Sequence, residues 1–80
     1  MLEPKPQHIV RLENALQEIN GQLVDEERAK VAKKANVDLR TLNPYLKGEV
    51  KSINTAKHII SVARKFIKDR DREIEKLTAA

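Results

Sequence analysis

Apolar residues recur at intervals of three and four along most of this 80-residue chain, which is the period of an amphipathic α-helix. Proline, glycine and short polar stretches divide the pattern into four segments. The pattern therefore predicts an all-α fold, a small four-helix domain with a long C-terminal helix. We expect its helices over about 7–20, 25–35, 39–47 and 55–77.

Residues with known preferences for helix ends stand at the borders of these segments. We expect Gly21 to end the first helix in a left-handed conformation and Gly48 to end the third. Asp25 is the predicted cap of the second helix, and the two glutamates after it favour the positive end of the helix dipole. Either Ser52 or Asn54 is suited to cap the last helix.

The first two predicted helices each have an apolar face for the core. The first is broad and is formed by Ile9, Leu12, Ala15, Leu16 and Ile19. The second is narrow, suits close contact between helices, and is formed by Ala29, Val31, Ala32 and Ala35.

The last predicted helix has a heptad repeat with one charged position, Arg70. The repeat consists of Ile53, Ala56, Ile60, Ala63, Ile67, Arg70, Ile74 and Leu77. In the first half of this helix, three more apolar residues broaden the apolar face, as a helix packed on a core requires. We therefore expect residues 1–67 to form the domain and residues 68–80 to form a polar extension of the last helix. The second half either pairs two copies through Ile67, Ile74 and Leu77, or lies along its own domain with an exposed end.

The stretch 31–48 has the pattern of a helix-turn-helix. Ala32 is small enough for close helix contact, and Asn36, four residues later, tolerates a left-handed backbone. Val37 fills the inside of the turn, and Asp38 is placed to cap the next helix. That helix has one apolar face, formed by Leu42, Tyr45 and Leu46.

Residues 31–48 resemble the DNA-binding headpiece of lactose-repressor-type regulators and, more loosely, the phage-repressor helix-turn-helix. The likeness extends over about 27–67, because 50–67 is similar to the third headpiece helix. It implies a helix-turn-helix at 27–48 whose second helix lies in the DNA major groove. The positions that meet base edges in such headpieces are occupied here by Leu39, Arg40, Asn43 and Pro44.

The side chains at these positions fit base readout. Arg40 has the geometry for two hydrogen bonds to guanine, Asn43 for the same with adenine, and Leu39 for contact with a thymine methyl group. Phosphate contacts, which set register rather than sequence, are expected from Lys33, Lys34, Lys47 and Lys51.

Pro44 does not fit this interpretation of the helix as a DNA-reading helix. It removes the N–H that would bond to the carbonyl of Arg40, at a cost of about 3 kcal/mol inside a helix. We expect it to kink or to end the recognition helix. It favours the alternative of a helical protein–protein interaction or assembly module in which the helix-turn-helix is only structural.

The net charge of +4 is unevenly distributed. Residues 1–27 hold two basic and six acidic side chains, a net of −4, whereas 28–80 hold 14 basic and six acidic ones, a net of +8. A basic face for a polyanionic partner and a merely solubilising surface both fit these charges.

The remaining chemistry is sparse. The chain has no cysteine, which excludes disulfides and zinc fingers, and His8 and His58 lack partners at metal spacing. We find no arrangement of nucleophile and base, and expect neither an enzyme nor a cofactor. No apolar run is long enough for a membrane span, and no signal region precedes the first helix, so we expect a cytoplasmic protein.

Together these features predict a sequence-dependent protein that binds double-stranded DNA, a small transcriptional regulator or accessory factor acting as a homodimer. Proteins with the resembling headpiece continue into a sugar-sensing domain, whereas this sequence stops at Ala80. We therefore expect no small-molecule effector.

Overall fold

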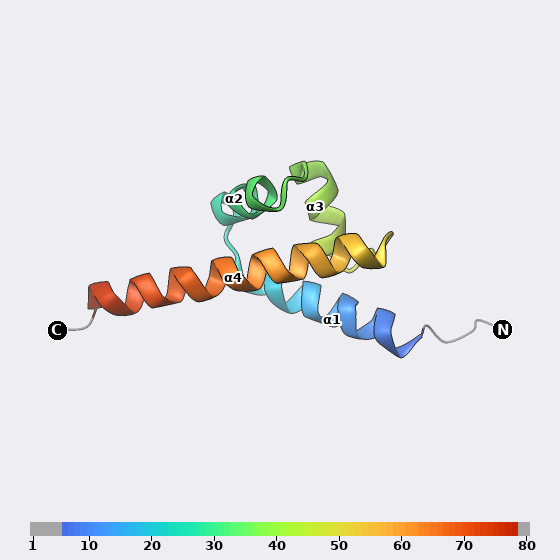
Figure 1. The fold of residues 1–80 in the computed structure, drawn as a ribbon, viewed down its shortest axis with the longest axis horizontal. Helices are drawn as coiled ribbons and strands as arrows, with labels where there is room; N and C mark the ends of the chain where they lie inside the picture. Colours follow the sequence, from blue (N-terminus) through green and yellow to red (C-terminus); the bar gives the residue numbers. More distant parts are fainter. Residues whose placement is uncertain (1–5, 79–80) are drawn as a thin grey trace.

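The computed structural model describes residues 6–78 and consists of four helices joined by short turns. They are α1 (Gln7–Gln22), α2 (Asp25–Ala35), α3 (Leu39–Leu46) and α4 (Ile53–Thr78). In Figure 1, α4 runs along the long axis of the molecule, α1 lies below it, and α2 and α3 lie above it. The all-α, four-helix prediction with a long C-terminal helix is confirmed.

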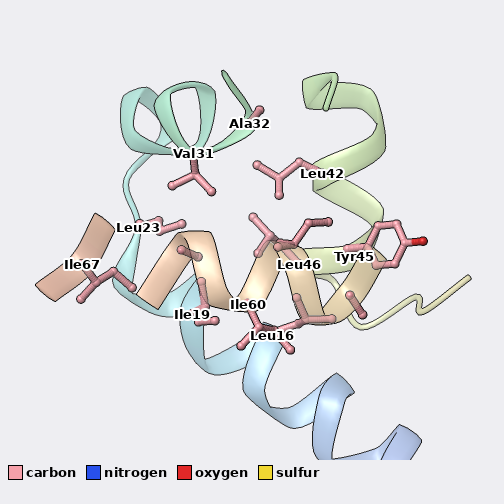
Figure 2. Packing of buried hydrophobic residues seen from close by; sticks show 13 residues of the cluster. Leu16, Ile19, Leu23, Val31, Ala32, Leu42, Tyr45, Leu46, Ile60 and Ile67 are labelled. Carbon is pink, nitrogen blue, oxygen red and sulfur yellow. The ribbon is translucent and has the colours of Figure 1, made fainter. Parts of the chain in front are cut away.

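One apolar core joins all four helices. α4 packs on α1 and α2, and α3 packs on the same two helices. Figure 2 shows the side chains of α3 converging with those of α1, α2 and α4. The core cluster comprises Leu16, Ile19, Leu23, Val31, Ala32, Leu42, Tyr45, Leu46, Ala56, Ile59, Ile60, Ala63 and Ile67.

The predicted faces of α1 and α2 are largely those that face the core. Ala29 is the exception, because it is exposed. At 3.6 residues per turn its side chain points roughly 110° away from the middle of the face that Val31, Ala32 and Ala35 bury. Its expected place in the helix contact was wrong.

α1 does not end at Gly21 as predicted. The helix continues to Gln22, and Gly21 has no left-handed φ angle. Asn20 O accepts the backbone N–H of Leu23 and a guanidinium N–H of Arg28, both at 3.4 Å, and Gln22 O accepts from Arg70 at 2.7 Å. These bonds close the helix without a left-handed glycine.

The caps of α2 and α3 and the start of α4 agree with prediction only in part. Val24, not Asp25, is the N-cap of α2, because Glu27 Oε1 accepts its N–H at 3.1 Å, as in half of a capping box. Asp38 does occupy the N-cap of α3, but its side chain makes no capping bond. α4 starts at Ile53, two residues early, with Ser52 Oγ accepting the N–H of Thr55 at 3.4 Å.

α4 has a packed and a projecting part. Ile67 is the last of its residues in the core, whereas Ile74 and Leu77 are 51% and 81% exposed. Every described residue after Arg70 is exposed. The residues after Arg70 therefore project from the rest of the described structure, whereas Arg70 itself still contacts α1 and α2.

We expect Leu42→Ala to lower the free energy of unfolding by about 2–5 kcal/mol, because Leu42 is fully buried and its loss leaves a cavity. The same substitution at exposed Leu77 should change it by less than about 0.5 kcal/mol. Urea denaturation of both variants measures the difference. Equal losses at the two positions would contradict this core.

Candidate nucleic-acid interface

The turn between α2 and α3 has the predicted left-handed residue. Asn36 has φ 59° and ψ 42°, and its N–H bonds to Lys33 O at 3.1 Å. The N–H of Val37 bonds to Ala32 O at 3.0 Å, while its side chain packs on the core. These bonds and contacts set the angle at which α3 leaves α2.

α3 buries one face and presents the other to solvent. Leu42, Tyr45 and Leu46 are buried, and Figure 2 shows Leu42 and Leu46 directed into the core, with the ring of Tyr45 at its edge. On the other side Arg40 is exposed, while Asn43 and Pro44 are half-buried. Leu39 lies nearly in line with buried Leu46 and is 41% exposed because it begins the helix, so Leu39 and Arg40 are more open to a ligand than Asn43 but point in different directions.

Pro44 lies inside α3 without ending it, since the helix continues to Leu46. In the turn that closes the helix, Lys47 and Glu49 both donate their N–H to Pro44 O, at 3.2 and 3.0 Å. Gly48, with φ 99°, completes this turn as predicted. Lys47 therefore directly follows the last helical residue.

Two hydrogen bonds hold the loop after α3. Tyr45 Oη accepts the N–H of Ser52 at 3.0 Å, and Gln17 Nε2 of α1 donates to Lys47 O at 3.4 Å. Gly48 lies so close to this glutamine that an added Cβ would stand 2.7 Å from Nε2. Because of this packing, the loop that carries Lys47 and Lys51 has a defined position.

The four predicted phosphate-binding lysines are exposed and lie near the two ends of α3. Lys33 borders the α2–α3 turn, lining the same hollow as Asn36 and Val37. Lys34 Nζ lies 5.5 Å from the centroid of the Phe66 ring on α4, a cation–π contact. Lys47 and Lys51 belong to the loop at the other end.

Arg70 has a role that its heptad position did not suggest. It bonds to Gln22 O on α1, to Glu27 Oε1 at 2.9 Å on α2, and to Asp71 on its own helix. The hydrogen bonds that Arg70 donates to Asp71 and to Glu27, together with the negative charges of both carboxylates, raise the pKa of Arg70 above its ordinary value, although desolvation by burial opposes the rise. Arg70 thus ties three helices together, and the charged interruption of an apolar repeat was its only sequence signal.

The residues predicted for dimerisation do not form one exposed surface. Ile67 is buried in the core of its own domain, whereas Ile74 and Leu77 are free for contact. Pairing of two copies stays a prediction, and of the three residues only Ile74 and Leu77 are exposed for it.

Replacement of Asn36 tests the turn. Asn36→Gly should leave the free energy of unfolding unchanged or raise it, because glycine adopts φ 59° readily. Asn36→Ala should have a free energy of unfolding about 1–2 kcal/mol lower than that of the glycine variant, because this φ angle is costly for alanine. Urea denaturation of the two variants checks this. An alanine variant as stable as the glycine variant would refute the left-handed turn.

No helix within residues 6–78 is long and apolar enough to cross a membrane. No protein-family model, characterised protein or solved structure matches this chain.

Proposed function

We propose that this chain binds double-stranded DNA in a sequence-dependent way, as a small transcriptional regulator or accessory factor of the cytoplasm. The observation that carries the proposal is the outer face of α3. Arg40 stands exposed opposite the buried face, and Leu39 is exposed at the start of the helix, directly after a left-handed turn. This is the arrangement in which a helix-turn-helix places its second helix in the major groove.

Base readout would come from the first turn and a half of α3. Arg40 forms no ion pair with any residue from 6 to 78, so its guanidinium is available for the O6 and N7 acceptors of guanine. Leu39 offers an apolar contact for a thymine methyl group, and Asn43 an amide for adenine. These three contacts precede Pro44, whose missing N–H therefore does not remove them.

Binding strength would come mainly from the lysines at the two ends of α3. Each phosphate that a lysine neutralises releases a condensed counterion, so the affinity falls as salt rises. Lys33 and Lys34 approach the backbone from the α2 side, and Lys47 and Lys51 from the α3–α4 loop. A second copy, paired through Ile74 and Leu77, would double these contacts on a two-fold site.

The alternative is a helical protein–protein interaction module in which the helix-turn-helix is structural. The projecting end of α4, with Ile74 and Leu77 exposed, favours it. Only the DNA proposal gives a function to the outer face of α3.

Binding of a labelled mixed-sequence duplex, followed by fluorescence anisotropy, should weaken steeply as salt rises. For Lys33→Gln we expect the slope of log K against log salt to fall by about 0.9, the value for one lost phosphate contact. Lys76→Gln removes the same charge from the exposed end of α4 and should leave the slope unchanged. Absence of binding at low salt would reject the DNA proposal.

Arg40→Ala should weaken binding to a selected preferred site by about 1–3 kcal/mol, with a smaller effect on random duplex, because the lost contact is to a base. Competition titrations with both duplexes measure this. Arg72→Ala, in the exposed part of α4, is the matched control and should affect neither. Equal losses on both duplexes would remove Arg40 from base readout.

A further inference from the structure

A groove between α1 and α4 has an apolar floor and a basic rim. It encloses about 510 Å³. The floor is formed by Leu12, Ala15 and Ile60. The rim is formed by Arg11, Lys57, Ser61 and Arg64, without an acidic side chain.

The groove continues along the junction of the two helices. A second hollow of about 160 Å³ shares Ala15 and Arg64 with the first and reaches Lys68. Its other lining residues include Ile19 and one acidic residue, Glu18. From Lys57 to Lys68 the α4 side of the groove is roughly 16 Å long at the rise of an α-helix.

The cations on the rim are not neutralised within the domain. Arg11, Lys57 and Arg64 form no ion pair with any residue in the described part of the chain. Lys68 is likewise without an ion pair there, so the rim holds four cations and one carboxylate, that of Glu18. An unpaired concentration of one charge around an apolar floor favours a ligand of the opposite charge.

This groove lies apart from the outer face of α3. Lys57, Ile60 and Arg64 share one side of α4, whereas Val62 and Phe66 lie on the nearly opposite side, where they line a hollow with Lys34 of α2. In Figure 1, α1 lies below α4 and the helix-turn-helix above it. A ligand in the groove would leave Leu39 and Arg40 uncovered.

We propose that the α1–α4 groove binds an acidic amphipathic helix of a partner protein. Three turns of helix span its length, so apolar residues at spacings of three and four would cover Leu12, Ala15 and Ile60. Carboxylates beside them would meet Arg11, Lys57 and Arg64. A DNA backbone matches the charges but has no apolar row to cover the floor. The proposal goes beyond DNA binding and does not depend on it.

The probe is a labelled synthetic helix of about 15 residues, built from leucine, alanine and glutamate with the leucines on one face. A peptide of the same composition in scrambled order has the same charge without the apolar row. At physiological salt we expect the amphipathic peptide to bind at least about tenfold more tightly than the scrambled one. Anisotropy measures both affinities in the absence of DNA.

Arg64 is the best residue to change, because it is exposed and lines both hollows. Arg64→Glu should weaken binding of the amphipathic peptide about tenfold or more. Lys30→Glu makes the same charge change on an exposed position of α2 and should weaken it less than about twofold. Circular dichroism of both variants checks that they remain folded.

Three results would overturn the proposal. Equal binding of the two peptides would show attraction by charge alone. Equal losses in the Arg64 and Lys30 variants would place the peptide elsewhere. If Arg64→Glu weakened duplex binding as much as peptide binding, the groove would belong to a nucleic-acid surface. If the wild-type protein bound no duplex, DNA binding would be rejected, but the proposal for the groove would stand.

Discussion

Burial of one face of α3 is the constraint on which the outer surface of this protein depends. A helix of eight residues with a proline in it is not stable alone in water. Leu42, Tyr45 and Leu46 hold it, and each buried side chain contributes about 1.5–3 kcal/mol. Because the same contacts set its rotation about its own axis, they also decide that Arg40 faces solvent. Core stability and the candidate binding surface are consequences of one packing arrangement.

Features that depend on neighbouring residues were predictable from the sequence. The left-handed turn at Asn36, the end of α3 near Gly48 and the apolar face of α3 follow from local backbone preference and from the helical period. The outward position of Arg40 follows from the same period. Pro44 does not end α3, which continues to Leu46 before the turn at Gly48 closes it with the backbone bonds that a left-handed glycine favours.

Features that join distant residues were not predictable. The end of α1 depends on Arg28 and Arg70, and the latter lies 48 residues from the carbonyl it binds. Gly21 was therefore given a capping role that these arginines fulfil in part. The basic groove likewise needs Arg11 of α1 beside Arg64 of α4, an adjacency that only the packed structure defines.

The size of the domain bears on how these surfaces would work together. Four lysines around one short helix correspond to few phosphate contacts, and non-specific binding by such small sets is weak at physiological salt. Stable occupancy of a DNA site would then require a further contact. Of the three residues expected to pair two copies, Ile74 and Leu77 are exposed, whereas Ile67 is already buried within the domain. The α1–α4 groove offers a longer surface than these two side chains. It has an apolar floor and lies away from α3. A partner helix held there would leave the proposed DNA-binding surface of α3 uncovered, and a partner that itself contacts DNA would add its own contacts to those of the lysines.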